Sequence, residues 1–275
     1  MKYQSKTLEQ LGARRRKRGA LASMLAALIV SMVGLGGAPA NAALSSNMCD
    51  FAIVVGVRGT GAPAGSNAVH DGRVWTNGGL GDQVAALRSS LINLPDMPFY
   101  FLGLNYPASP VLQPSIQQGV STLIWELNYI NEKCPYAPII LAGHSQGAAV
   151  ISHMLASPGF LKPEAKAGIR NVVLFGDPEY KTGMVTNVAN KPNNGLLSAQ
   201  LLFPKTALAD YKYWGYPEDS NVEQWLYKVR EYCNAGDYFC QSNFADSDFT
   251  IHNQYKQYAP GAAKWIQYTL TWFGR

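Results

Sequence analysis

The chain has 275 residues, of which 47% are hydrophobic and 15% are charged, which is sufficient for one domain with a well-buried core. This composition excludes an intrinsically disordered protein. The formal net charge of +5 originates in the first 42 residues, which hold seven Lys or Arg and one Glu; the remainder has a charge of −1. No basic character then remains that would favour nucleic acid as a partner.

The N-terminal segment has the organisation of a secretory signal peptide. A positive run, 14–18, precedes an apolar stretch at 20–35, and Ala40-Asn41-Ala42 supplies small residues at the two positions that signal peptidase recognises. The apolar stretch is short for a membrane-spanning helix. We therefore predict a signal peptide at residues 1–42, a single domain at residues 43–275, and a mature protein that is secreted or associated with the cell envelope.

Apolar runs of strand length alternate with helical periodicity through the first two thirds of the mature chain. Continuous apolar runs of this kind are typical of strands buried on both faces of a parallel sheet. The predicted strands are 51–57, 98–104, 138–142 and 171–175, and the predicted helices are 79–94, 115–131 and the segment after residue 145. This alternation predicts an α/β fold, a three-layer sandwich with helices on both faces of a central, mainly parallel sheet. Ligand sites in such sheets lie at the carboxyl ends of the strands, where Thr60, Ser145 and Asp177 fall.

The last third of the chain is less regular. Residues 181–220 lack clear periodicity and are interpreted as a long excursion, followed by a helix at about 222–232 and a terminal helix at about 260–273. Long loops in compact domains tend to be functional or mobile. The aromatic residues in and after this excursion either pack on the core or form a partial lid or acyl-binding wall. These residues are Tyr211, Tyr213, Trp214, Tyr216, Trp225 and Tyr227.

A G-x-S-x-G motif, Gly143 to Gly147, lies between the strand that ends at Ala142 and a run of small residues that begins at Ala148. In this setting a serine is held in a sharp, strained turn, and larger residues two positions before or after it would collide. The motif therefore predicts Ser145 as a catalytic nucleophile. An ordinary turn is the alternative interpretation.

A catalytic serine needs a base, and the chain has four histidines, His70, His144, His153 and His252. His144 lies inside the turn, where its side chain is expected to point away from the serine hydroxyl. His153 is two helical turns downstream, and His70 lies in a Gly-rich loop before the candidate acids. His252 follows every predicted strand, in the chain order serine, acid, histidine of α/β hydrolases, and is the predicted base.

The acid must accept the other ring N–H of the base and hold the imidazole in the correct tautomer. Asp237 lies in a short loop between two cysteines and is the predicted acid. Asp177, at the end of a predicted strand, is its competitor. Asp246 and Asp248 are too close in sequence to the histidine for this role and are expected to be solvated.

Four cysteines in an exported chain suggest two disulfides, with three possible connectivities. The close spacing of Cys233 and Cys240 favours a bridge that closes the loop of the acid. This leaves Cys49, just before the first strand, to pair with Cys134, just before the strand of the nucleophile. No metal site is predicted, because no C-x-x-C or H-E-x-x-H spacing occurs and the histidines are scattered.

Together these motifs resemble the cutinase family of secreted serine esterases, including the cutinase-like proteins of mycolic-acid actinobacteria. The resemblance covers most of the mature chain in order. It is carried by Cys49-Asp50, Arg58-Gly59-Thr60, Asn105-Tyr106-Pro107-Ala108, Cys134-Pro135, the 143–147 motif with Ala148-Ala149, Leu174 to Pro178, Cys233 through Asp237 to Cys240, and His252. A related resemblance, in Gly59-Thr60-Gly61 and the Tyr-Pro-Ala region, is to mycobacteriophage enzymes that cleave mycolic esters. Those generally lack this signal peptide and cysteine frame.

The resemblance implies a cutinase-like α/β-hydrolase domain with Ser145, Asp237 and His252 as a catalytic triad. Thr60 and the backbone N–H of Gln146 would form the oxyanion hole, and both cysteine pairings match those of the family. The implied activity is hydrolysis of a carboxylic ester through an acyl-enzyme, by a monomer, without a metal or organic cofactor. The substrate would be an ester or lipid, such as a cutin-like polyester or an envelope lipid. The alternatives are a cell-envelope mycolic ester hydrolase or acyltransferase, and a catalytically silent lipid-binding protein of the same fold.

Overall fold

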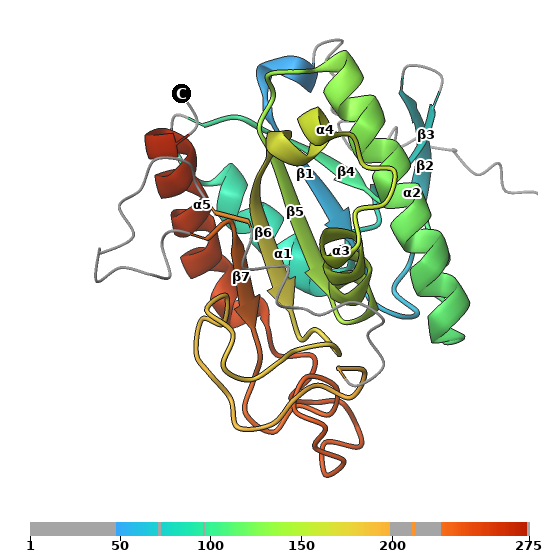
Figure 1. Cartoon of the computed structure of the whole chain (residues 1–275), viewed down its shortest axis with the longest axis vertical. Helices are drawn as coiled ribbons and strands as arrows, with labels where there is room; N and C mark the ends of the chain where they lie inside the picture. The colour runs from blue at the N-terminus through green and yellow to red at the C-terminus, as the bar shows by residue number, and fades with distance from the viewer. Residues whose placement is uncertain (1–47, 71–72, 96, 199–210, 213–226, 274–275) are drawn as a thin grey trace, which may run out of the picture. The chain divides into compact units, whose positions relative to one another are not determined.

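The computed structural model describes residues 48–70, 73–95, 97–198, 211–212 and 227–273 (Figure 1). The predicted signal peptide, residues 1–42, and most of the second half of the predicted excursion lie outside these residues. Among the described helices, none is both long enough and apolar enough to cross a membrane.

The described residues form a seven-stranded sheet in the order β2-β3-β4-β1-β5-β6-β7. Five neighbouring strands run parallel: β4 (Phe99–Gly103), β1 (Ala52–Val57), β5 (Ile139–His144), β6 (Ile169–Phe175) and β7 (Val229–Tyr232). At one edge, β2 (Gly65–His70) and β3 (Arg73–Gly78) form an antiparallel hairpin, and β3 pairs antiparallel with β4. The predicted α/β fold with a central, mainly parallel sheet is thus confirmed.

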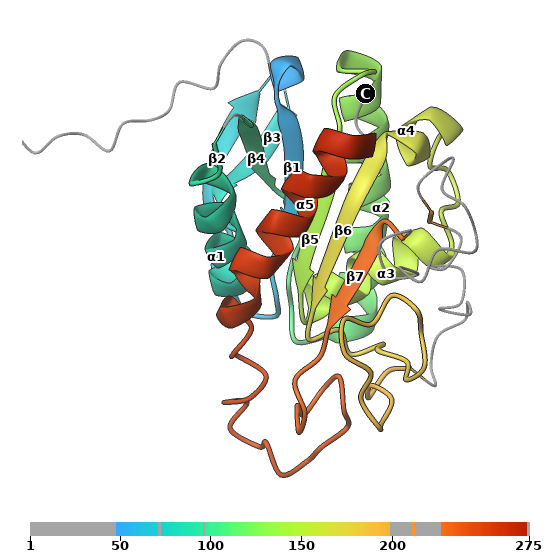
Figure 2. The same ribbon diagram turned by 90° about the vertical axis from the view of Figure 1, so that its left-hand side faces the viewer.

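Helices cover both faces of the sheet (Figure 2). On one face lie α1 (Gly81–Ile92) and α5 (Ala259–Phe273), and on the other lie α2 (Leu112–Lys133), α3 (Gln146–Ala156) and α4 (Pro163–Gly168). Two short 3₁₀ helices, η1 (Met48–Asp50) and η4 (Lys256–Tyr258), complete the elements. The central strands are therefore buried on both faces, which accounts for their unbroken apolar sequences.

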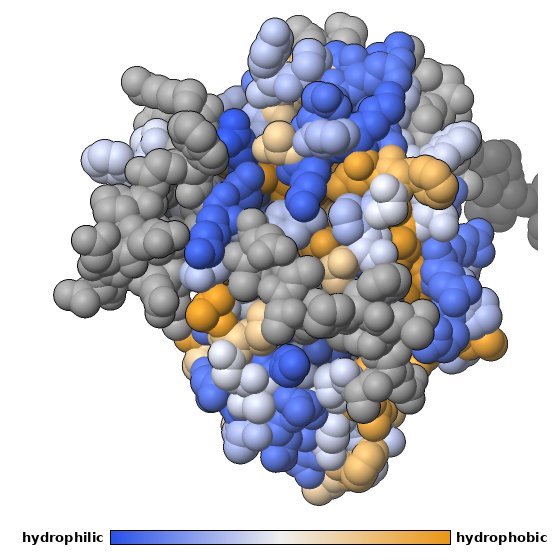
Figure 3. All heavy atoms as spheres, in the orientation of Figure 1, coloured by the Kyte–Doolittle hydropathy of each residue, from blue (hydrophilic) through white to orange (hydrophobic). Residues whose placement is uncertain are grey.

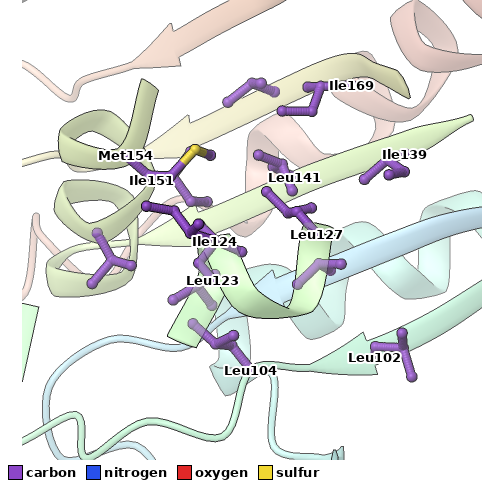
Figure 4. Packing of buried hydrophobic residues seen from close by; sticks show 14 of the residues in the cluster. Leu102, Leu104, Leu123, Ile124, Leu127, Ile139, Leu141, Ile151, Met154 and Ile169 are labelled. Carbon is purple, nitrogen blue, oxygen red and sulfur yellow. The ribbon is translucent and has the colours of Figure 1, made fainter. Parts of the chain in front are cut away.

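Successive side chains of a strand enter opposite layers of the core. In β5, Leu141 packs with α2 and α3, whereas its neighbour Ile140 belongs to the cluster beneath α1 and α5. Figure 4 shows the core layer between the sheet and α2 and α3, where Leu123 and Leu127 of α2 and Met154 of α3 lie near Leu141. Both layers hold the sheet rigid, so the loops at its carboxyl end start from fixed points.

The predicted helix at about 222–232 is wrong throughout its described part, residues 227–232. Residues 229–232 form β7, which pairs with β6 through Val172↔Val229 to Phe175↔Tyr232. The preceding residues 222–226 lie outside the described part. The segment contains good helix formers, but the free edge of β6 supplies backbone partners that outweigh this local preference.

The loops that follow β5, β6 and β7 emerge at the same end of the sheet, and the last two lie together below it in Figure 1. Figure 3 shows hydrophobic residues at the surface near this lower end, and Phe244 and Phe249 of the loop after β7 are exposed. Two disulfides are present, in the expected pairing: Cys49–Cys134 joins η1 to the end of α2, and Cys233–Cys240 closes a turn directly after β7.

Candidate active site

Ser145 occupies a strained turn between β5 and α3. Its φ of 54° and ψ of −122° are unusual for a residue with a side chain. Its N–H donates to the carbonyl of Phe175 at 2.9 Å. A Cβ at Gly147 would lie 2.0 Å from the carbonyl oxygen of Val57, and one at Gly143 would lie 2.6 Å from that of Gly147. Only glycine fits at these two positions, so the motif is required by the close approach of the backbones.

His252 and Asp237 are hydrogen-bonded to each other. His252 Nδ1–H donates to Asp237 Oδ2 at 2.8 Å, and the two residues are 4% and 0% exposed. The other ring nitrogen, Nε2, is buried and has no hydrogen-bond partner among the described residues. His252 is therefore held in one tautomer, with Nε2 left as an acceptor.

The carboxylate of Asp237 is enclosed by hydrogen-bond donors. Oδ2 accepts from His252 and from the Tyr255 hydroxyl, at 2.8 and 2.7 Å, and Oδ1 accepts the backbone N–H groups of Phe239 and Cys240 at 2.7 and 2.8 Å. Burial by itself raises the pKa of Asp237, but the interactions with His252, Tyr255 and Cys240 outweigh it and hold the pKa below its ordinary value. Asp237 is thus an ionised carboxylate in a protein interior.

Asp177, the competing acid, lies against α3. Its carboxylate accepts hydrogen bonds from the Ser152 hydroxyl and from the N–H of Glu179, at 2.9 Å for the second. His153, on the same helix, is paired with Glu179. Asp177 is fully buried, and the structure places it with α3 rather than with His252. The carboxylate at His252 is that of Asp237.

The expectation that Asp246 is solvated is wrong. Asp246 is 4% exposed, and its carboxylate accepts the N–H groups of Ile251 and His252 at 2.9 and 3.0 Å. The loop folds back on itself, so a residue six positions before the histidine supports its backbone. Asp248 is exposed, as expected, and its carboxylate accepts hydrogen bonds from the backbone N–H and the hydroxyl of Thr250.

The His144 ring lies against that of His252. Their ring centroids are 4.9 Å apart, and His144 Nε2–H donates to the carbonyl of His252 at 3.1 Å. Burial, followed by the charge of His252, lowers the pKa of His144 to about 3, so the ring is neutral at ordinary pH. The remaining histidine, His70, has its backbone in β2 and a side chain outside the described part.

Of the two predicted oxyanion-hole residues, Gln146 follows Ser145 in the chain and Thr60 lies on a loop that approaches Ser145. Gln146 is the first residue of α3, where backbone N–H groups have no partner within the helix. Its side chain donates to the carbonyl of Ser109 at 2.7 Å and accepts from the Ser115 hydroxyl at 2.9 Å. Thr60 is exposed on the loop after β1. Next to it, a Cβ at Gly59 would lie 3.3 Å from that of Ser145, so the backbone of this loop passes close to Ser145.

A buried arginine fixes the loop of Thr60. The Arg58 guanidinium donates to the carbonyls of Ala62, Leu104 and Tyr106 at 2.9, 3.1 and 2.6 Å, and the Tyr106 hydroxyl donates back to the Arg58 carbonyl at 2.6 Å. Burial lowers the pKa of Arg58. The loops after β1 and β4 are thereby tied together. The sequence pointed to both segments through Arg58-Gly59-Thr60 and Asn105 to Ala108, but not to this clamp.

Ser145, His252 and Thr60 line one pocket of about 650 Å³. Its wall is largely apolar with a few polar groups. The other lining residues are Gly59, Gly61, Ala62, Pro63, Gly81, Asp82, Gln83, Pro110, Leu112, His144, Phe239, Phe249 and Asn253. A concave, mainly apolar pocket with convergent polar groups is typical of small-molecule and lipid sites.

The aromatic cluster is only partly described. Tyr211 and Tyr227 are buried, and neither lines the pocket; the Tyr211 hydroxyl donates to the carbonyl of Leu155 at 3.1 Å. Tyr211 therefore packs in the core, whereas the ring of Tyr227 lies beneath Lys212, whose Nζ is 5.3 Å from its centroid. The other four, Tyr213, Trp214, Tyr216 and Trp225, lie outside the described residues. In the described part of the excursion, residues 181–198 contain no helix or strand and do not line the pocket.

The family model of the cutinases matches residues 48–270. The chain belongs to the cutinase family. Among similar proteins, the phospholipase Culp4 of Mycobacterium tuberculosis is 31% identical over 179 residues, which are 62% of this chain and 70% of that protein. Endolysin B of Mycobacterium phage L5 is 28% identical over 147 residues, 49% of this chain and 50% of the phage protein. The chain therefore spans about half the length of that phage relative.

Solved structures share the fold. An acetyl xylan esterase superimposes with a TM-score of 0.57 at 21% identity, over 80% of this chain and 99% of the esterase. A cutinase-like protein from Cryptococcus sp. gives the same TM-score at 20% identity, over 82% of this chain and 97% of that protein. At such identities the likeness concerns the arrangement of strands and helices.

Proposed function

We propose that this cutinase-family protein is a secreted serine carboxylic ester hydrolase in which Ser145, His252 and Asp237 act as a catalytic triad. The observation that carries the proposal is the state of His252. One ring nitrogen is held by a buried carboxylate at 2.8 Å, and the other has no partner among the described residues of a pocket that also contains the strained serine. This is the arrangement that a general base for a serine requires.

In the proposed reaction, Ser145 Oγ attacks the ester carbonyl while His252 Nε2 takes the hydroxyl proton. The imidazolium that forms is stabilised by the carboxylate of Asp237. The tetrahedral intermediate carries a negative oxygen, which Thr60 and the Gln146 N–H bind. Collapse breaks the ester C–O bond, and His252 returns the proton to the leaving alcohol. Water, activated by the same histidine, then releases the acid from the acyl-enzyme.

The position of Gln146 supports its proposed role. The N-terminus of α3 presents unpaired N–H groups and the positive end of the helix dipole, both of which favour an anion. Because the Gln146 side chain is bonded to Ser109 and Ser115, the backbone at this position is fixed before substrate arrives. A donor that needs no rearrangement stabilises the transition state more than the ground state.

The proposed substrates are esters with an apolar acyl part. The pocket wall includes Pro110, Leu112 and Phe249, which offer an apolar surface beside the serine. The related proteins include a phospholipase and several cutinases. Secretion is supported by the leader sequence of residues 1–42 and by the two disulfides, which persist in oxidising compartments.

A direct test compares hydrolysis of a p-nitrophenyl ester by the wild-type mature protein and by the Ser145→Ala variant. Alanine keeps the small volume that the turn requires, so the variant should fold. We expect turnover to fall by several orders of magnitude, since the remaining residues of a triad act poorly alone. Ser121→Ala is a matched control, because Ser121 is exposed on α2 and its hydroxyl bonds only within its helix.

Equal turnover in the wild type and in Ser145→Ala would contradict the proposal. If the wild type bound a fatty-acyl ester without hydrolysing it, the alternative of a silent lipid-binding protein would replace it. Circular dichroism and thermal unfolding of each variant show whether a loss of activity comes from a loss of the fold.

A further inference from the structure

Tyr255 is a fully buried tyrosine that lies behind the His252–Asp237 pair. Its hydroxyl donates to Asp237 Oδ2 at 2.7 Å, the same oxygen that accepts His252 Nδ1–H at 2.8 Å. The hydroxyl also accepts the backbone N–H of Asn234 at 3.0 Å. A single phenol thus connects the carboxylate to the backbone at the end of β7.

The direction of the Tyr255 hydroxyl proton follows from its partners. The N–H of Asn234 can only donate, so it occupies a lone pair of the phenol oxygen. Two acceptors remain, Asp237 Oδ2 at 2.7 Å and the disulfide-bonded sulfur of Cys240 at 3.2 Å. Because a carboxylate oxygen is a far stronger acceptor than a disulfide sulfur, the proton points at Asp237. Burial and the charge of Asp237 raise the pKa of Tyr255 well above its ordinary value, so the phenol keeps this proton.

Packing fixes the Tyr255 ring. Its centroid is 6.1 Å from that of Phe175 and 5.8 Å from that of His144. At Gly176, which has a φ of +57°, a Cβ would lie 2.8 Å from Tyr255 Cε2 and 3.0 Å from His252 Cε1. The absence of a side chain there allows both rings to approach the strand end. The hydroxyl is therefore placed by the core and not by the substrate.

We propose that Tyr255 is a positioning residue for the triad, whose hydroxyl holds the Asp237 carboxylate so that Oδ2 faces His252 Nδ1. This inference rests on the proposed ester hydrolase. In the acylation step His252 gains a proton, and its orientation toward the serine depends on the carboxylate that it is bonded to. A carboxylate free to rotate about its χ2 angle would share its oxygens among other donors and would hold the imidazole less well.

The proposed role of Tyr255 predicts a change in how activity depends on pH. The interaction with Tyr255 is among those that lower the pKa of Asp237, so removing the hydroxyl raises that pKa. Among the described ionisable groups, His252 is hydrogen-bonded to Asp237, His144 interacts with it electrostatically, and Asp246 lies on the loop of His252. A carboxylate that has lost this donor attracts protons more strongly, and a proton taken up by the Asp237–His252 pair removes the base. Activity should then be lost at a higher pH on the acid side. A purely structural defect would lower activity equally at every pH.

The experiment measures kcat and KM for a p-nitrophenyl ester as functions of pH in the wild type, Tyr255→Phe and Tyr258→Phe. We expect Tyr255→Phe to lower kcat by about 10-fold near neutral pH with little change in KM. The acid limb of the kcat–pH profile, where activity falls as the pH is lowered, should move to higher pH. Tyr258→Phe is the matched control. Its hydroxyl bonds the Asn234 side chain at 2.8 Å, its ring packs against that of Tyr255, and it does not touch Asp237. It should follow the wild type.

An unchanged acid limb in a folded Tyr255→Phe variant, or an equal shift in Tyr258→Phe, would overturn the inference. Incorporation of 3-fluorotyrosine at position 255 covers the case in which the Phe variant does not fold. It keeps the hydroxyl and makes it a stronger donor, so it should move the acid limb to lower pH; a shift to higher pH, or none, would also overturn the inference. If the wild type itself has no serine-dependent activity, the proposed function fails instead, and the two failures are distinguished.

Discussion

At the scale of single residues, two of the buried carboxylates near the carboxyl end of the sheet, Asp237 and Asp177, differ in what they bind. Asp237 binds a histidine ring, whereas Asp177 binds a serine hydroxyl and a backbone N–H. We predict that Asp237→Asn lowers kcat by up to about 10⁴-fold, because the amide favours the wrong tautomer of His252. Asp177→Asn should act mainly on stability, at a cost of about 1 to 3 kcal/mol.

Steady-state kinetics and urea unfolding of both variants check this pair of expectations. Each variant serves as the control for the other, since both replace a fully buried carboxylate by its isosteric amide. A larger loss of kcat in Asp177→Asn than in Asp237→Asn would reassign the acid to Asp177.

The sequence predicted the residues whose roles follow from a motif or from chain order. Ser145 was predicted from its flanking glycines, His252 from its order after the predicted strands, and Asp237 from its place between two cysteines. Asp246 and Tyr255 were not, because their contacts depend on how the loop after β7 folds. Proximity in sequence suggested that Asp246 would be solvated, yet its loop turns back and buries it. A tyrosine three residues after the histidine carries no local sign of the direction in which its hydroxyl points.

At the scale of elements, the two disulfides differ in what they constrain. The two cysteines of Cys233–Cys240 are 7 positions apart in the sequence, and those of Cys49–Cys134 are 85 positions apart. The short loop carries the acid, and the Cys240 N–H donates to Asp237. In the loop-entropy model the short bridge contributes about 2.5 kcal/mol and the long one about 4.6 kcal/mol. We predict that Cys233→Ser with Cys240→Ser folds but loses most of its esterase activity. Cys49→Ser with Cys134→Ser should keep activity and have the lower unfolding temperature.

Far-UV circular dichroism, thermal unfolding and ester hydrolysis separate the two double variants. The short-loop variant is sensitive because a displacement of about 1 Å in a catalytic group can cost about 10²-fold in rate. Full activity in that variant would show that the other hydrogen bonds of Asp237 suffice to hold the acid loop. A disulfide between Cys49 and Cys233 or Cys240 in the non-reduced, digested protein would contradict the structural basis of both expectations.

The strands that the sequence predicted are those whose burial on both faces demands unbroken apolar runs, namely β1, β4, β5 and β6. The edge elements lack this constraint. In β7, Arg230 and Glu231 interrupt the apolar pattern, and backbone pairing makes the segment a strand, with β6 on one side and a bridge to Asn187 on the other. The β2–β3 hairpin has a polar, Gly-rich sequence; the Asp71-Gly72 dipeptide between its strands is a hairpin signal that could have indicated it.

At the scale of the whole molecule, the parallel sheet collects residues that are far apart in the sequence. Thr60 follows β1, Ser145 follows β5, and Asp237 and His252 follow β7. Because parallel strands end at the same side, these four positions converge without any long-range motif to specify them. The net charge is also unevenly distributed: the positive charge belongs to residues 1–42, and residues 43–275 have a formal net charge of −1.

Covalent labelling detects an activated serine at position 145 in the folded protein. The mature protein is treated with a fluorophosphonate probe, with and without prior heat denaturation, and the labelled peptide is located by mass spectrometry. The proposed triad predicts rapid stoichiometric labelling at Ser145 in the folded protein, strongly reduced labelling in His252→Ala, and none after denaturation. Labelling at another residue, or no labelling of the folded wild type, would contradict the account.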